Sequence, residues 1–172
     1  MRLLLVRHPG TAATRRAAVP RDEPATAPLH DLTGWLGQRG TVLTSPARRC
    51  HVPGATVEPL LRPWDLGRWA GLPLTEVIDA PAWRADPAYD GHGGESLLAL
   101  LARVRLLLRQ WDEVSGRLAA VTHSAVIRAV LVEILHAPPE AFWDIDVMPG
   151  AHSELHRRRA RWRVTSINVT QI

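Results

Sequence analysis

Two histidines that are far apart in the sequence each follow a short apolar run. His8 ends the segment Leu4-Leu5-Val6-Arg7-His8, and His123 lies within Ala120-Val121-Thr122-His123-Ser124. Arg7 places a permanent cation beside the first imidazole. A phosphate group needs fixed positive donors, and a neutral imidazole nitrogen can attack phosphorus. The residue types and their pattern therefore favour an anionic ligand and phosphoryl transfer to histidine.

The apolar runs before these polar residues have the character of buried strands. Leu3 to Val6, Thr41 to Thr44 and Leu118 to Thr122 are short and largely apolar, as is typical of strands in a parallel sheet. Residues 124–136 continue from the third run with apolar side chains at helical spacing, and Pro138-Pro139 is expected to stop this helix. His123 is therefore expected at a strand-to-helix turn, where anions bind in open α/β sheets.

Ser96 to Trp111 has the clearest helical pattern. Its apolar residues at 97, 100, 101, 104, 108 and 111 share one face, and Arg103 is expected off that face. Gly93-Gly94-Glu95-Ser96 predicts the helix start, with Ser96 or a neighbour as cap. Residues 11–32 and 61–90 lack periodicity and are expected to form loops or short helices over a site. Residues 154–169 are expected to form two strands around 158–160.

The size and composition of the chain fit one domain over residues 1–172. At 172 residues and 46% apolar, the chain is large enough for one sizeable core and too short for two. All 21 basic residues are Arg, which excludes a lysine Schiff base and a phosphate loop ending in Gly-Lys-Ser or Gly-Lys-Thr. The alternating pattern predicts an α/β fold, a three-layer αβα sandwich with a mainly parallel central sheet.

Cysteine content and hydropathy bear on where the protein works. Cys50 is the single cysteine, so no disulfide can form within the chain, which suits a reducing compartment. The apolar run before Arg7 is too short for a signal-peptide core, and Leu97 to Leu108 is too short to span a bilayer. We therefore expect a cytoplasmic protein without a membrane partner.

Five motifs occur along the chain in one order. They are Arg7-His8-Pro9, Ser45 to Arg49, Gly67-Arg68-Trp69-Ala70-Gly71, Gly93-Gly94-Glu95-Ser96 and Thr122 to Arg128. In this order and spacing they resemble the histidine phosphatase superfamily, the phosphoglycerate-mutase-like fold, whose corresponding motifs are Arg-His-Gly, Ser-Pro-x-x-Arg, Gly-x-Trp-x-Gly, Gly-Gly-Glu-Ser and Ser-His-Gly-Gly-Val-Ile-Arg. The resemblance covers nearly the whole chain.

The resemblance implies a role for each matching residue. His8 would be the nucleophile that becomes phosphorylated, and Arg7, Arg49 and His123 would hold the phosphoryl oxygens. The helix that starts after His123 would add backbone N–H donors from Ser124 or Ala125. The family spacing selects Arg49 for this role.

The general acid departs from the family pattern. In many relatives a Glu four residues before the first glycine of Gly-x-Trp-x-Gly protonates the leaving oxygen, and Pro63 stands at that position here. Asp65 is the nearest carboxylate, and it is either the acid or a cap of the turn at Gly67. Glu95 is a second candidate, although a carboxylate at a helix start also favours the helix dipole. Pro9 replaces a glycine and resembles a variant found in α-ribazole phosphatase-like proteins.

The resemblance implies cofactor-independent hydrolysis of a small phosphate monoester, with inorganic phosphate as a product and with no metal. The Arg-His-Pro variant, residues 86–90 and the short length are most similar to α-ribazole phosphatase-like members, which would make α-ribazole 5′-phosphate of cobalamin biosynthesis the substrate. A broad-specificity phosphatase, a phosphoglycerate mutase-like enzyme and a phosphate-binding protein without turnover remain alternatives.

Three further clusters have simpler interpretations. His152 and His156 lack a carboxylate of suitable spacing, so a metal site is not expected. The arginines between 157 and 163 alternate with apolar residues as in an edge hairpin, so a nucleic-acid partner is not expected. Aromatic residues at 64, 69, 83 and 89 could stack on a base or pack beneath long loops. Whether the chain forms a homo-oligomer is left open.

Overall fold

The computed structural model describes residues 1–29, 31–32 and 40–170 and contains one six-stranded sheet. The strand order is β3-β2-β4-β1-β5-β6. The strands are β1 (Arg2–Arg7), β2 (Thr41–Thr44), β3 (Thr56–Val57), β4 (Arg117–Thr122), β5 (His152–Arg158) and β6 (Arg161–Val169). The first four in this order are parallel and the last two pair antiparallel. The expected α/β fold with a mainly parallel sheet is confirmed, as are the three predicted strands and the C-terminal hairpin.

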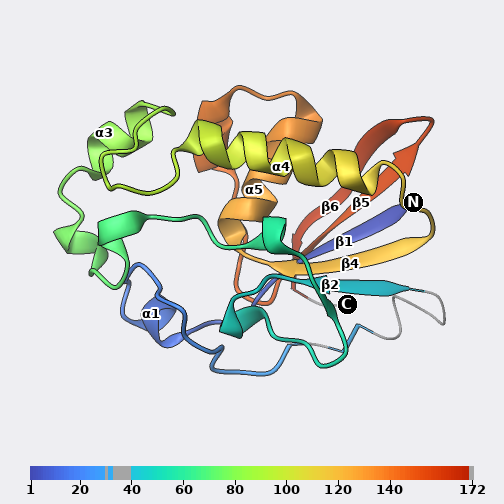
Figure 1. Cartoon of the computed structure of the whole chain (residues 1–172), viewed down its shortest axis with the longest axis horizontal. Coiled ribbons are helices and arrows are strands. Elements are labelled where there is room, and N and C mark those ends of the chain that lie inside the picture. Colours follow the sequence, from blue (N-terminus) through green and yellow to red (C-terminus); the bar gives the residue numbers. More distant parts are fainter. Residues whose placement is uncertain (30, 33–39, 171–172) are drawn as a thin grey trace.

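Two long helices pack together on one face of the sheet. They are α4 (Leu97–Trp111) and α5 (Ser124–Leu135), and Figure 1 shows both above the strands. The Ser96 side chain accepts a hydrogen bond from the Ala99 amide at 3.2 Å, which confirms the predicted cap. His136 in the left-handed conformation, with φ of 52°, ends α5, so the helix stops before Pro138 is reached.

The prediction for Arg103 is wrong. Arg103 is buried on the inner face of α4 between Leu100 and Leu107. A guanidinium can occupy such a position only when its donors are satisfied.

Short helices, turns and loops, and not long helices, make up most of the remaining described chain. On the opposite face of the sheet, Leu4, Val6, Ala119 and Val121 pack against Leu32 and Cys50. The short elements are α1 (Ala12–Arg15), α3 (Ala80–Ala85) and the 3-10 turns Arg48–Cys50, Pro59–Leu61, Gly67–Trp69, Leu74–Glu76 and Pro139–Asp144. The expectation of loops and short helices in residues 11–32 and 61–90 is confirmed where the chain is described. α1 and α3 lie beyond the carboxyl ends of β1 and β4 (Figure 1).

No helix in the part of the chain that the structure describes is both long and apolar enough to cross a membrane.

Candidate active site

The parallel pairing of β1 with β4 brings the two histidines together. Arg7 lies opposite Thr122 in this pairing, and the His8 amide donates to the Thr122 carbonyl at 2.9 Å. The His8 and His123 rings are 5.1 Å apart between centroids and meet edge to face. Because both strands end at the same edge of the sheet, residues that are distant in sequence form one site.

The environment of His8 keeps one ring nitrogen free. Its Nδ1 lies 2.6 Å from the Pro9 carbonyl oxygen, and since a carbonyl only accepts, we assign the proton to Nδ1. Nε2 then carries an unshared electron pair. Burial lowers the pKa of His8 to about 4, and the charges of Arg49 and Arg7 add to this while the Pro9 carbonyl opposes it. His8 is therefore neutral at pH 7, the state that a nucleophile needs.

His123 is fixed in the opposite tautomer. Arg49 Nε donates to His123 Nδ1 at 3.3 Å, and His123 Nε2 lies 2.8 Å from the Ser45 hydroxyl. Because Nδ1 accepts, Nε2 carries the proton. Burial lowers the pKa of His123 well below its ordinary value, with Arg49 and His8 contributing. The ring thus stays neutral and orients Arg49 at the site.

Two guanidinium groups border the imidazole pair. Arg49 is only 5% exposed and its Nη1 donates to the Arg21 carbonyl at 2.7 Å. Arg7 donates to the Val147 carbonyl, and burial followed by the charge of Arg128 lowers its pKa to about 10. Both groups remain cationic at pH 7. Arg48, by contrast, is exposed, which agrees with the choice of Arg49 from the spacing.

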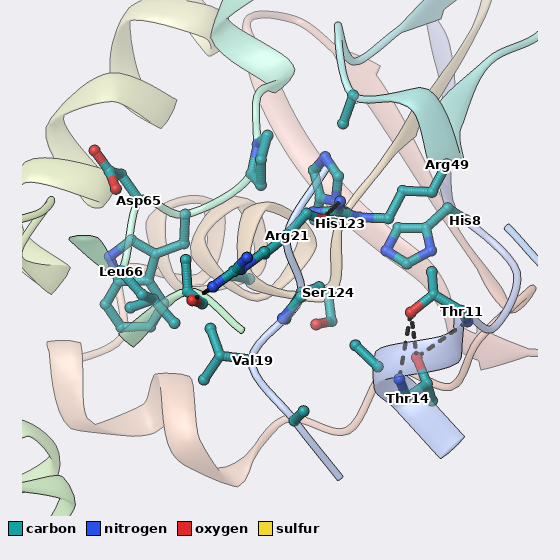
Figure 2. Close-up of a pocket in the computed structure, with 18 of the residues that line it drawn as sticks. His8, Thr11, Thr14, Val19, Arg21, Arg49, Asp65, Leu66, His123 and Ser124 are labelled. Atoms are coloured by element: carbon teal, nitrogen blue, oxygen red, sulfur yellow. Dashed lines mark hydrogen bonds between the residues drawn. The ribbon is translucent and has the colours of Figure 1, made fainter. Parts of the chain in front are cut away.

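These side chains line one cleft of about 880 Å³. Ser124 and Ala125, at the amino end of α5, line the same cleft and present helix N–H groups to it. Figure 2 shows His8, Arg49, His123 and Ser124 on one side and Asp65 and Leu66 on the other. The structure therefore brings together the residues expected to bind and receive a phosphoryl group.

Asp65 is not part of this group. It lines the cleft, but its carboxylate is directed away from His8 in Figure 2. Its Oδ1 accepts from the Gly67 amide at 2.9 Å. This is the turn cap that the sequence offered as the alternative to an acid. The turn has φ of 50° at Gly67, and a Cβ there would collide with the His92 carbonyl, so the Gly-x-Trp-x-Gly motif docks closely on Gly93-Gly94.

Glu95 pairs with Arg103, the residue whose burial the sequence analysis did not predict. Arg103 donates to both carboxylate oxygens of Glu95 at 2.8 Å. The same guanidinium donates to the Leu60 and Arg62 carbonyls at 2.6 and 3.0 Å. Glu95 and Arg103 thus fix the loop around Pro63, and neither side chain is among those that line the cleft.

The aromatic residues form one connected cluster that borders the cleft at one end. Trp64 and Trp83 line the cleft together with Phe142 and Trp143, and the Trp64 and Trp83 rings are 5.0 Å apart. Trp83 also meets the buried Trp69 ring edge to face at 5.3 Å, and Trp69 stacks on Tyr89. The residues that line the cleft are available to a ligand, whereas Trp69 is part of the packing behind them.

No group of three or more His, Cys, Asp or Glu side chains within residues 1–29, 31–32 and 40–170 is arranged to hold a metal ion. His152 lies in β5 and is buried, and His156 lies on the same strand. The structure supplies no further ligand for them in that range.

Neutral imidazoles and guanidinium groups lie together at the carboxyl ends of parallel strands in an α/β fold, a combination suited to an anionic ligand. The sequence pattern of the histidine phosphatase superfamily (branch 1) matches residues 38–170. The chain therefore belongs to this superfamily.

A curated relative and several solved structures resemble the chain. Glucosyl-3-phosphoglycerate phosphatase from Mycobacterium tuberculosis is 34% identical over 97 residues, which is 48% of this chain and 44% of that protein, so the match spans under half of the relative's length.

Among solved structures, the mycobacterial glucosyl-3-phosphoglycerate phosphatase bound to VO3 has a TM-score of 0.77 at 22% identity, covering 98% of both chains. The α-ribazole phosphatase from Shigella flexneri has a TM-score of 0.79 at 21% identity, covering 100% of this chain and 98% of that one. A phosphoserine phosphatase mutant from Entamoeba histolytica, in complex with phosphoserine, has a TM-score of 0.81 at 17% identity, covering 99% and 98%. At these identities the solved structures establish the shared fold.

Proposed function

We propose that the chain hydrolyses a small phosphate monoester through a phosphohistidine at His8. The family match and the phosphatase names of the relatives support a phosphoric monoester hydrolase. The observation that carries the mechanism is His8 itself, a buried neutral imidazole whose Nε2 is free and which lies beside two guanidinium groups. Such an imidazole is a competent nucleophile, and the cations stabilise the charge of the transferring phosphoryl group.

The reaction would take two steps. His8 Nε2 attacks phosphorus, the P–N bond forms, and the bond from phosphorus to the alcohol oxygen breaks. Water then attacks phosphorus, the P–N bond breaks, and inorganic phosphate leaves with neutral His8 restored. Arg7, Arg49 and the amide of Ser124 would hold the phosphoryl oxygens throughout. His123 was expected to join them, but its two ring nitrogens bond Arg49 and Ser45, so its proposed role is to orient Arg49. The scheme needs no metal ion and no organic cofactor.

The departing alcohol oxygen must also gain a proton. The sequence offered Asp65 and Glu95 as candidate acids, Glu95 is paired with Arg103, and water is the remaining source. The hydrogen bond from the Gly67 amide to Asp65 and the orientation of its carboxylate in Figure 2 favour water. A general acid is typically worth roughly 10² to 10⁴ in rate, so turnover through water would be slower and would still occur.

Within this class, we propose α-ribazole 5′-phosphate as the first substrate to test, on the basis of the Arg-His-Pro motif and residues 86–90. The aromatic wall formed by Trp64 and Trp83 supports a ligand with a flat ring. A broad-specificity phosphatase and a mutase remain alternatives. A mutase must keep its phosphoryl group until it re-donates it, so a long-lived phosphoenzyme in water would favour the mutase.

The deciding experiment combines turnover with trapping of the adduct. Wild type, His8→Ala and Asp65→Asn would be incubated with a panel that includes α-ribazole 5′-phosphate, glucosyl-3-phosphoglycerate and p-nitrophenyl phosphate. We expect phosphate release by wild type, none by His8→Ala, and an acid-labile, base-stable adduct mapped to His8. His51→Ala is the matched control, because it removes an exposed imidazole outside the cleft.

Two outcomes would redirect the assignment. If wild type binds phosphate esters and releases phosphate from none, a binding protein without turnover replaces the phosphatase, as the loss of the usual acid at Pro63 would allow. If Asp65→Asn loses activity on alkyl esters and its pH profile changes, Asp65 supplies the proton after all.

A further inference from the structure

Besides Arg7 and Arg49, three more arginines line the cleft: Arg21, Arg62 and Arg128. Arg128 lies in α5, five residues after His123, and its side chain is 23% exposed. Its Nε is buried and has no hydrogen-bond partner among the described residues. Removing a guanidinium from water without satisfying its donors is costly, so a group kept in this state is a candidate for binding a ligand.

The positive charge of Arg128 is poorly balanced within the protein. Its ion pair with Asp146 is 3.7 Å long, and the Asp146 side chain is 95% exposed, a kind of pair that contributes little. Burial lowers the pKa of Arg128, the charge of Asp146 opposes this, and the charge of Arg84 lowers the pKa by less. Because the Asp146 carboxylate is exposed and 3.7 Å away, the Arg128 charge stays available to an anion in the cleft.

The position of Arg128 is fixed relative to the catalytic pocket. Arg7 donates to the Val147 carbonyl, and the neighbouring Asp146 pairs with Arg128, so one two-residue segment contacts both guanidinium groups. The Arg128 guanidinium also lies over the Phe142 ring, 5.6 Å from its centroid. Arg128 is therefore held beside the phosphoryl pocket on the wall that a bound substrate would face.

Arg7 and Arg49 already border His8, so the phosphoryl group leaves Arg128 without a partner. We propose that Arg128 binds a second anionic group, a carboxylate or another phosphate, on the same substrate whose phosphoryl group His8 receives. This inference rests on the proposed phosphatase activity and narrows it to monoesters with two anionic groups. α-Ribazole 5′-phosphate has only one such group, so a second anion site would count against it as the substrate. Arg128 would then be a specificity residue, because its charge-assisted hydrogen bonds form only with such substrates.

The test compares two esters that differ at one carbon. 3-Phosphoglycerate and sn-glycerol 3-phosphate share the phosphate and the neighbouring hydroxyl, and only the first carries a carboxylate. We expect wild type to prefer 3-phosphoglycerate in kcat/KM by about tenfold or more, the ratio that one charge-assisted contact supports. Arg128→Gln should bring the ratio close to one, and Arg128→Lys should restore part of it. Fructose 1,6-bisphosphate against fructose 6-phosphate tests a second phosphate in the same way.

Arg62→Gln is the matched control. Arg62 lines the same cleft and carries the same charge, but it pairs with Glu95 at 3.3 Å. This variant should keep the wild-type ratio within about twofold. If Arg62→Gln and Arg128→Gln lower the ratio equally, the preference comes from the net charge of the cleft and Arg128 has no specific role.

The remaining outcomes separate this inference from the proposed function. A wild-type ratio near one for both pairs, or an unchanged ratio in an Arg128→Gln protein with wild-type circular dichroism and unfolding midpoint, would overturn the second anion site alone. Absence of phosphate release and of any His8 adduct with all four esters and with p-nitrophenyl phosphate would instead refute the phosphatase.

Discussion

Replacing His8 with Gln should change how the stability of the protein depends on pH. The folded-state pKa of His8 is about 4, against an unfolded value of about 6.5. Between these values the unfolded chain binds more protons than the folded chain, so stability falls as the pH drops through this window. Above pH 6.5 both states are neutral at His8 and the residue contributes nothing to the pH dependence.

The size of the effect follows from the two pKa values. The loss of unfolding free energy due to His8 is about 2 kcal/mol at pH 5 and approaches about 3 kcal/mol below pH 4. The His8→Gln variant lacks the pH-dependent loss of unfolding free energy that His8 causes. Any contribution from His123 occurs in both proteins and cancels in the comparison. Between pH 7.5 and pH 5 wild type should therefore lose about 2 kcal/mol more stability than the variant.

The measurement is urea unfolding at the two pH values, followed by tryptophan fluorescence. Comparing the differences between pH values removes any constant cost of the substitution, such as the lost hydrogen bond to Pro9. His51→Gln, at an exposed position, is the control and should behave like wild type. Equal losses in wild type and His8→Gln would refute the reasoning, because they would mean that folding does not perturb His8. The same pKa predicts that kcat/KM falls on the acid side only near pH 4.

Three other substitutions test the site. Pro63→Glu should raise kcat for alkyl phosphates by about 10-fold to 100-fold. The increase for p-nitrophenyl phosphate should be much smaller, because its weakly basic leaving group needs no proton. If the ratio of the two rates does not change, position 63 is not the position of the general acid. Arg103→Met should lower the unfolding free energy by about 3 to 5 kcal/mol, measured in urea, since it leaves the buried carboxylate of Glu95 with only the more exposed Arg62 as a partner. A loss below about 1 kcal/mol would show that the pair is not structural. Arg49→Gln should lower kcat/KM by about 100-fold or more, while Arg48→Gln stays within about twofold of wild type, and similar losses in both would remove the distinction drawn between them.

The strands and long helices could be predicted because their signals are local. A short, unbroken apolar run such as Leu3 to Val6 is typical of a strand that is buried on both faces of a sheet. The cap at Ser96 follows from the chemistry of its own side chain and the next turn of helix. Arg103 was misplaced because its burial depends on carbonyls of residues 60 and 62, about forty positions earlier. Nothing in the helical periodicity describes those partners.

The candidate site shows the same division. The order and spacing of the motifs identified His8, Arg49 and His123 and assigned them to strand ends. Three-dimensional structure was needed to show that Asp65 is bound to the Gly67 amide. It was also needed to show that Arg128 faces the cleft with little to balance its charge.

By itself, the sequence determined the α/β architecture and the chemical character of the groups at the strand ends, because backbone patterning and side-chain type are encoded locally. Only the tertiary structure decided the protonation state of the histidines and the hydrogen-bond and ion-pair partners of the charged side chains. The free Nε2 of His8 depends on the carbonyl next to its ring and on the burial that holds it neutral. Desolvation and charge balance are sums over neighbours from separate parts of the chain, and they exist only once folding has brought those neighbours together.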